Sequence, residues 1–144
     1  DTAITGIDVS EEMLEIARSR ARRMKERNIE LMSMDAETMT FQENSFDCVV
    51  VPYVLSVTPN PTELINEIRR VCKKDGVILI VNHFSGSSFW WLLERAFSSL
   101  AAKIGFRSDF SYKEQILNHN WQVKQATNVN IFGLSKIVEI HNCK

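Results

Sequence analysis

Two carboxylates, Asp8 and Asp35, end or closely follow short apolar runs of the sequence. A carboxylate at the end of a strand, just before a helix, is placed to accept hydrogen bonds from both hydroxyls of a ribose. Asp35 is suited to accept a hydrogen bond from the exocyclic amine of adenine. Each residue also has a simpler interpretation, as a turn aspartate that caps a helix or stabilises a loop. Together the two residues predict a nucleoside site, and two structural aspartates are the alternative.

Three further polar residues, Tyr53, Asn82 and His83, follow apolar runs that are expected to form buried strands. In open α/β sheets ligands bind beyond the carboxyl ends of the strands, so these side chains are expected to face a substrate. Tyr53 offers a hydroxyl and an aromatic face that attracts cations, and His83 can accept a proton near neutral pH. The alternative for His83 is a structural loop histidine.

The composition of the chain excludes several classes of protein. Its 144 residues, 44% hydrophobic and 24% charged, are typical of one soluble domain. A net charge of −1, without basic residues interleaved among the aromatics, predicts no nucleic-acid partner. The three cysteines have no metal-binding spacing, and we expect Cys48 and Cys72 to be small core residues in a reducing compartment. No apolar run reaches 18 residues, so no segment is predicted to span a membrane.

The elements that must position these residues alternate between strands and helices. Ala3–Val9 is predicted to be a strand, and Ser10 then caps a helix that runs to about Arg27. Ile29–Ser33 is a second strand. The β-branched run in Phe46–Tyr53 is typical of a central strand buried on both faces.

The second half of the chain continues the alternation of strands and helices. Its expected elements are a helix starting at Asn60-Pro61, a turn at Asp75-Gly76, a strand Val77–Val81, helices Phe89–Ala102 and Lys113–His119, and strands Gln122–Asn130 and Ser135–His141. Strands separated by helices imply a mainly parallel sheet, and the last two strands form an antiparallel hairpin. The predicted fold is α/β, three-layered and Rossmann-like.

Four motifs occur in a fixed order along this sequence: Gly6–Leu14, Asp35–Glu37 followed by Phe41, Asn44–Val50, and Glu67–Gly76. This order resembles class I S-adenosylmethionine-dependent methyltransferases, especially the group that includes quinone and phospholipid methyltransferases. The resemblance covers nearly the whole chain. It implies a Rossmann-like fold with S-adenosylmethionine as the cofactor.

The resemblance assigns roles to individual residues. Asp8 is expected to bind the ribose hydroxyls, Val9 to pack on the adenine, Asp35 to bind the adenine amine, and Ala36 to offer its backbone N–H. Asp47 corresponds to a structural acid at the start of a strand, without a catalytic role.

One feature of that family has no counterpart in this sequence. The methionine end of the cofactor usually lies on a G-x-G-x-G loop after the first strand, and no two of the five glycines here are close enough to form it. We therefore expect a single N-terminally truncated domain, 1–144, without the family's first strand and helix. A homo-oligomer or a strand exchanged between copies would then replace the missing partner of the 3–9 strand. The alternative is a non-catalytic fragment or interaction module that does not bind the cofactor.

The segments expected to face the substrate carry a more specific resemblance. Val51–Pro61, Asn82–Phe84, Gly105–Phe110 and Asn128–Gly133 resemble the bacterial phosphatidylethanolamine N-methyltransferases of the quinone-methyltransferase-like type. This implies N-methylation of an ethanolamine headgroup, and a quinone or another apolar small molecule is the alternative acceptor.

We expect Tyr53 and His83 to be catalytic, and Tyr53, Asn82, His83 and Trp90 to contact the substrate. Trp90 belongs to Ser87–Leu100, a segment rich in aromatics that can lie on a bilayer or form a lid; an ordinary core helix is the alternative. The predicted location is the cytoplasm, with peripheral contact at the inner membrane face.

Overall fold

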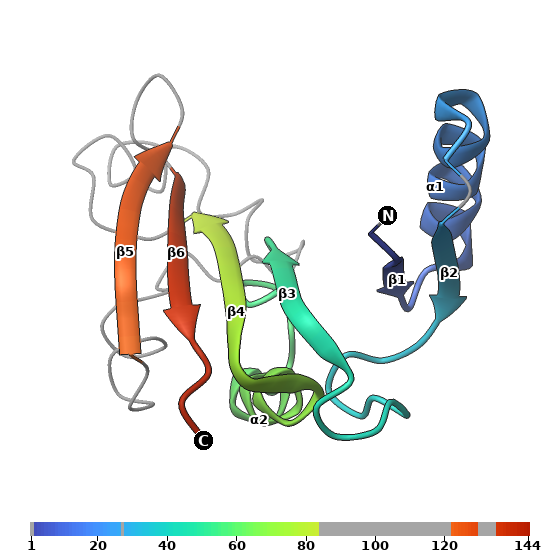
Figure 1. Cartoon of the computed structure of the whole chain (residues 1–144). Coiled ribbons are helices and arrows are strands. Elements are labelled where there is room, and N and C mark those ends of the chain that lie inside the picture. The colour runs from blue at the N-terminus through green and yellow to red at the C-terminus, as the bar shows by residue number, and fades with distance from the viewer. Residues whose placement is uncertain (1, 27, 84–121, 130–134) are drawn as a thin grey trace. The chain divides into compact units, whose positions relative to one another are not determined.

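The structure is a computed structural model, and the residues that it describes are 2–26, 28–83, 122–129 and 135–144. These residues divide into two compact units, Asp1–Thr40 and Phe41–Lys144, which are described separately. Figure 1 labels the helices and strands of both units. The predicted helices at 89–102 and 113–119 lie outside the described residues.

The first unit contains β1 (Ile4–Asp8), α1 (Glu11–Met24) and β2 (Ile29–Ser33). β1 and β2 pair in parallel, and α1 packs against both strands (Figure 1). The predicted N-cap is confirmed, since the Met13 N–H donates to Ser10 Oγ at 3.3 Å. Lys25 adopts a left-handed backbone conformation that ends α1 at Met24, three residues before the predicted boundary at Arg27.

The second unit contains a four-stranded sheet in the order β3-β4-β6-β5. Its elements are β3 (Phe46–Pro52), α2 (Pro61–Val71), β4 (Cys72–His83), β5 (Gln122–Val129) and β6 (Ser135–His141). β3 and β4 are parallel, whereas β6 is antiparallel to both β4 and β5. The α/β class and the closing antiparallel hairpin are therefore confirmed.

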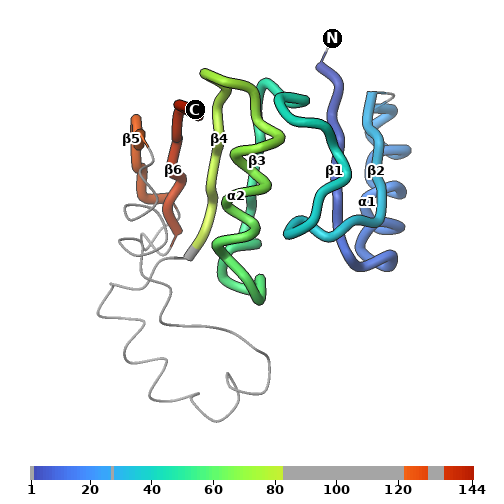
Figure 2. Tube along the Cα trace, turned by 90° about the horizontal axis from the view of Figure 1, so that it is seen from below, coloured from blue at the N-terminus to red at the C-terminus, as the bar shows by residue number. Residues whose placement is uncertain are grey.

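The core of the second unit lies between α2 and the sheet, where α2 packs on β4 (Figure 2). Alternating residues of β4 and β6 point to one face, so their apolar side chains share a layer with the apolar stripe of α2. The residues of this layer that are at most 1% exposed are Leu64, Ile65, Ile68, Val71, Ile78, Ile80, Val138 and Ile140. This layer fixes the positions at which β3 and β4 end.

The prediction that β3 is buried on both faces is wrong. Val51 is buried, but Val50 is 57% exposed and Cys48 is also exposed. Within the described part of the chain β3 pairs only with β4, so it is an edge strand of this sheet. Cys48 is consequently no core residue, whereas Cys72 is buried as predicted.

The predicted turn at Asp75-Gly76 lies inside β4. Phe46 pairs with Cys72, but Cys48, two residues on, pairs with Val77. The extra residues of β4 bulge out of the ladder, and Asp75 takes a left-handed backbone conformation there with φ 61°. Asp75 and Gly76 favour a turn, and a bulge accommodates them while the strand continues on both sides.

Asn142, just after β6, closes the carboxyl end of α2. Its Nδ2 lies 3.0 Å from the Arg69 carbonyl oxygen, 2.9 Å from that of Cys72 and 3.2 Å from that of Lys73. Its backbone N–H also donates to the Gly76 carbonyl oxygen at 2.9 Å. The last carbonyls of a helix have no partner within the helix, so a buried asparagine that donates to them satisfies a requirement of the fold.

The cysteines should differ in reactivity. Burial raises the pKa of the Cys72 thiol, and the reactive thiolate is scarce at neutral pH, whereas Cys48 and Cys143 are exposed. We expect a chromogenic disulfide reagent at pH 8 to titrate two thiols rapidly in the folded protein and three after denaturation. If three thiols react rapidly in the folded protein, Cys72 is reached by the reagent and the α2–β4 junction that contains it opens readily.

Two further properties concern only the described residues. No helix among them is long and apolar enough to cross a membrane. They also contain no group of three His, Cys, Asp or Glu side chains that could hold a metal ion.

Candidate functional site

Asp8 is the last residue of β1 and lies at the carboxyl end of the two-stranded sheet. Its Oδ1 accepts a hydrogen bond from the Ser10 N–H at 2.8 Å, which fixes the carboxylate at the entry to α1. The side chain is exposed. In the described part of the chain Oδ2 accepts no hydrogen bond, so this oxygen faces a ligand or solvent.

Asp35 repeats this geometry two residues beyond β2. Its Oδ1 accepts a hydrogen bond from the Glu37 N–H at 2.8 Å, and its side chain is exposed. The Met34 N–H donates to the Asp8 carbonyl oxygen at 3.1 Å, which joins the ends of β1 and β2. Asp8 and Asp35 are thus presented at the same edge of one sheet, each held by the turn that follows it.

This edge fits the adenosine half of S-adenosylmethionine. Two oriented carboxylates can accept from ribose hydroxyls and from an adenine amine. Val9, next to Asp8, is 71% exposed, which makes it an apolar surface of the kind on which a purine ring packs. Ala36 is half-buried beside Asp35, and its small side chain leaves the backbone there open to a ligand. The residues present therefore match the chemistry of an adenosine group.

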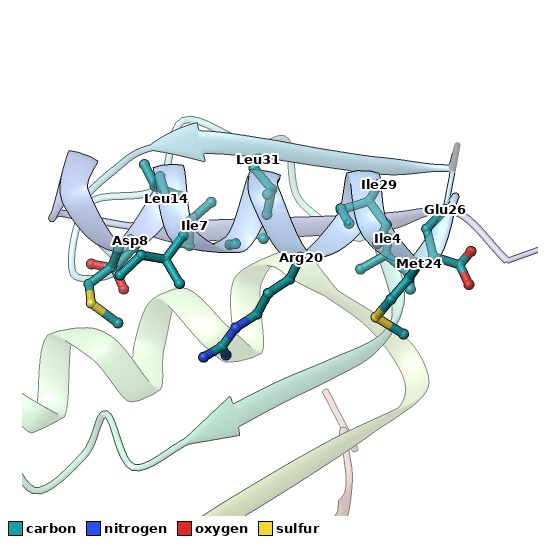
Figure 3. A pocket seen from close by; sticks show the side chains of 14 residues that line it. Ile4, Ile7, Asp8, Leu14, Arg20, Met24, Glu26, Ile29 and Leu31 are labelled. Atoms are coloured by element: carbon teal, nitrogen blue, oxygen red, sulfur yellow. The ribbon is translucent and has the colours of Figure 1, made fainter.

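An open apolar groove of about 540 Å³ runs along β1, β2 and α1, with Asp8 among its lining residues. Figure 3 shows Asp8 at one end of the groove and Met24 and Glu26 at the other. β1 pairs only with β2 among the described strands. Exposed Met13 and Met24 contribute to this apolar face.

Tyr53 and Asn82 lie together in the second unit, where β3 and β4 end. The Tyr53 N–H donates to the Val81 carbonyl oxygen at 2.7 Å, so the parallel ladder extends one residue beyond β3. Tyr53 is 42% exposed, whereas Asn82 is fully buried. The Ser56 hydroxyl lies between them, 3.3 Å from the Tyr53 carbonyl oxygen and 3.1 Å from Asn82 Oδ1.

His83 is the last residue of β4 and pairs with Ser135 of β6 in the antiparallel ladder. The His83 side chain and the whole of Trp90 lie outside the described residues, so their predicted contacts with a substrate stay predictions. The residues predicted to face adenosine and the Tyr53–Asn82 pair belong to different compact units.

Sequence reasoning did not single out Ser56 and Ser135. Ser56 is 5% exposed and Ser135 is fully buried, with its Oγ 3.5 Å from the Tyr53 hydroxyl oxygen. The position of Ser56 three residues after Tyr53 is compatible with a hydroxyl-to-backbone turn and could have indicated it. Ser135 depends on the register of β6 against β4, which no local pattern reveals.

The sequence is similar to those of known methyltransferases. A family model described as a methyltransferase domain matches residues 2–80. The chain is 35% identical over 134 residues to a phosphatidylethanolamine N-methyltransferase of Cereibacter sphaeroides, covering 92% of this chain and 66% of that protein. It is 27% identical over 139 residues to a demethylmenaquinone methyltransferase of Listeria welshimeri, covering 95% of this chain and 56% of that protein.

A crystal structure of a SAM-dependent methyltransferase from Methanosarcina mazei has a similar fold. The TM-score is 0.74 at 20% sequence identity, and the match covers 98% of this chain and 82% of that one. This likeness confirms the Rossmann-like fold. Because the family model spans more than half of the sequence, the chain belongs to the methyltransferase domain family, which implies S-adenosylmethionine as its cofactor.

Proposed function

We propose that the protein transfers methyl groups from S-adenosylmethionine to the amine of an ethanolamine phospholipid headgroup. In this proposal Asp8, Val9, Asp35 and Ala36 hold the adenosine half of the cofactor. The observation that carries the proposal is the pair of exposed, turn-held carboxylates at the ends of adjacent parallel strands. Similarity to the Cereibacter enzyme extends over 92% of this chain, including the segments expected to face the acceptor.

When bound, S-adenosylmethionine supplies a methyl group activated by its sulfonium sulfur. The residues of this chain must then orient a neutral amine and remove its proton. We assign the first task to Tyr53, whose partly exposed side chain offers a hydroxyl for hydrogen bonding and a ring face that stabilises a cation. We assign the second to His83, and Asn82 and Trp90 are proposed to contact the acceptor.

A quinone is the second candidate acceptor, because the Listeria relative is named a demethylmenaquinone methyltransferase and matches 95% of this chain. Its lower identity, 27% against 35% over a similar length, favours the phospholipid. Both acceptors have apolar tails, so an acceptor with an apolar part is common to the two proposals.

The two acceptors are separated by one assay on the intact gene product. Methyl-labelled S-adenosylmethionine is supplied with vesicles that contain phosphatidylethanolamine, demethylmenaquinone, or both. We expect the label in the phospholipid fraction, as mono-, di- or trimethylated headgroups. Label in the quinone alone would replace the first acceptor by the second. No label, together with no calorimetric binding of S-adenosylhomocysteine, would favour a non-catalytic module.

A further inference from the structure

Tyr53 has an unusual backbone conformation. Its φ is 57°, in the left-handed region that bulky residues rarely adopt. Residues in such conformations persist when surrounding contacts over-determine them, and they gather at binding and catalytic sites. The hydrogen bond from its N–H to the Val81 carbonyl oxygen fixes the amide side of the residue. A second contact, on the carbonyl side, stabilises the same conformation from the other direction.

Ser56 supplies that second contact. Its hydroxyl has one proton, and the Tyr53 carbonyl oxygen at 3.3 Å and Asn82 Oδ1 at 3.1 Å are both within reach of it. Ser56 and Asn82 are both buried, so water does not compete for this proton. Ser56 thus joins the turn that carries Tyr53 to the end of β4.

Ser135 contacts the other end of Tyr53. It is the first residue of β6, and its buried Oγ lies 3.5 Å from the Tyr53 hydroxyl oxygen. An O–H···O contact of this length is weak, but it sets a preferred direction for the hydroxyl. A phenol hydroxyl has further hydrogen-bonding capacity, so Tyr53 can also contact a polar group of a ligand.

We propose that Ser56 and Ser135 are positioning residues for Tyr53, the first fixing its backbone and the second directing its hydroxyl. This inference rests on the proposed function, in which Tyr53 orients the acceptor amine. Misplacing a group that aligns reacting atoms slows transfer even when every substrate still binds. Loss of either serine therefore lowers kcat without weakening cofactor binding, since the adenosine-facing residues belong to the other unit.

A double-mutant cycle on the intact protein tests the role of Ser135. Methyl transfer to phosphatidylethanolamine vesicles is measured for wild type, Ser135→Ala, Tyr53→Phe and the double variant. We expect Ser135→Ala to lower kcat about 5- to 20-fold, with KM for S-adenosylmethionine within about twofold. In the Tyr53→Phe background the hydroxyl is gone, so the same change should cost less than about twofold. Equal losses in both backgrounds would reduce Ser135 to a packing residue and overturn the proposal.

Ser56 is tested by rescue. Ser56→Ala should lower kcat, whereas Ser56→Thr keeps the hydroxyl and should recover most of the rate. The matched control is Ser45→Ala, because the exposed Ser45 also donates to a nearby carbonyl oxygen, that of Gln42 at 2.7 Å, away from Tyr53. We expect this control to match wild type. A threonine variant as slow as the alanine variant would count against a role for the Ser56 hydroxyl.

A spectroscopic measurement separates failure of this inference from failure of the proposed function. These 144 residues contain two tyrosines, so Tyr112→Phe leaves Tyr53 as the one tyrosine among them, and after fluorotyrosine incorporation the Tyr53 resonance is assigned by its loss in Tyr53→Phe. We expect Ser135→Ala to shift that resonance and Ser45→Ala to leave it unchanged. If the protein methylates no phospholipid but Ser135→Ala still shifts the resonance, the proposed function is wrong and the role of Ser135 in positioning Tyr53 stands. An unmoved resonance overturns the inference.

Discussion

Replacing Asp8 by asparagine is expected to weaken binding of S-adenosylhomocysteine to the intact protein by about 10- to 100-fold. Hydrogen bonds to a charged group contribute about 1.5–3 kcal/mol, and each 1.4 kcal/mol is a factor of ten in Kd. Asparagine can still accept from the Ser10 N–H, so the turn into α1 is retained. The loss therefore reports the ribose contact of the second carboxylate oxygen. Isothermal titration calorimetry gives the two Kd values directly.

Asp47→Asn is the matched control for this change. Asp47 is also an exposed carboxylate, but it lies in β3 and forms an ion pair with Lys73 at 2.7 Å. Exposed pairs contribute about 0–1 kcal/mol to stability, and Asp47 is not at the edge formed by Asp8 and Asp35. We expect the control to bind like wild type. If both substitutions weaken binding equally, or if neither weakens it, Asp8 does not bind the ribose.

Asn142→Ala is expected to lower the free energy of unfolding by about 2–4 kcal/mol. The substitution removes the two N–H donors of Nδ2 from the carbonyl oxygens of Arg69, Cys72 and Lys73 at the α2–β4 junction, and buried acceptors left without partners cost about 1–3 kcal/mol each before relaxation. Urea unfolding followed by circular dichroism should show a lower midpoint with an unchanged slope, the pattern of a pure stability change.

Asn66→Ala provides the comparison, because Asn66 is an exposed asparagine within the same helix. Alanine is the better helix former, so this variant should be as stable as wild type or slightly more stable. Asn142→Asp should be at least as unstable as Asn142→Ala, since an ionised carboxylate has no proton to donate. If Asn142→Asp unfolds like wild type, the three contacts are not what stabilises the end of α2.

The elements whose signals are local could be predicted from the sequence. Ile29–Ser33 and Ser135–His141 are strands with the predicted bounds, because each apolar or β-branched run is limited by polar residues. Ser10 is an N-cap because its short side chain suits that position wherever a helix begins. Asn60 shows the limit of this reasoning: it occupies the N-cap position of α2, but its side chain makes no capping hydrogen bond. Pro61 at the helix start already lacks the N–H that would be left without a partner.

Features that depend on distant parts of the chain could not be predicted. At the bulge of β4, Gly76 comes so close to β3 that a Cβ would lie 2.9 Å from the Asp47 carbonyl oxygen, a contact that depends on the pairing of the two strands. The exposure of Cys48 follows from the place of β3 at the edge of its sheet, which is a property of strand order. The contact between Ser135 and Tyr53 spans 82 residues. The positions of Asp8 and Asp35, by contrast, could be predicted, because each carboxylate is held by a local turn that spans two residues.

The cap that Asn142 places on α2 also has a consequence for protein synthesis. Asn142 emerges 70 residues after Cys72, whose carbonyl it binds. At about 5–20 residues per second, the ribosome needs several seconds to supply it. During that interval water must solvate the end of α2, and the edge of β4 that pairs with β6 has no strand beside it. The second unit therefore cannot complete its folding on the nascent chain until β6 has left the exit tunnel, and a pause in translation before that point prolongs the exposure of its apolar sheet to chaperones and proteases.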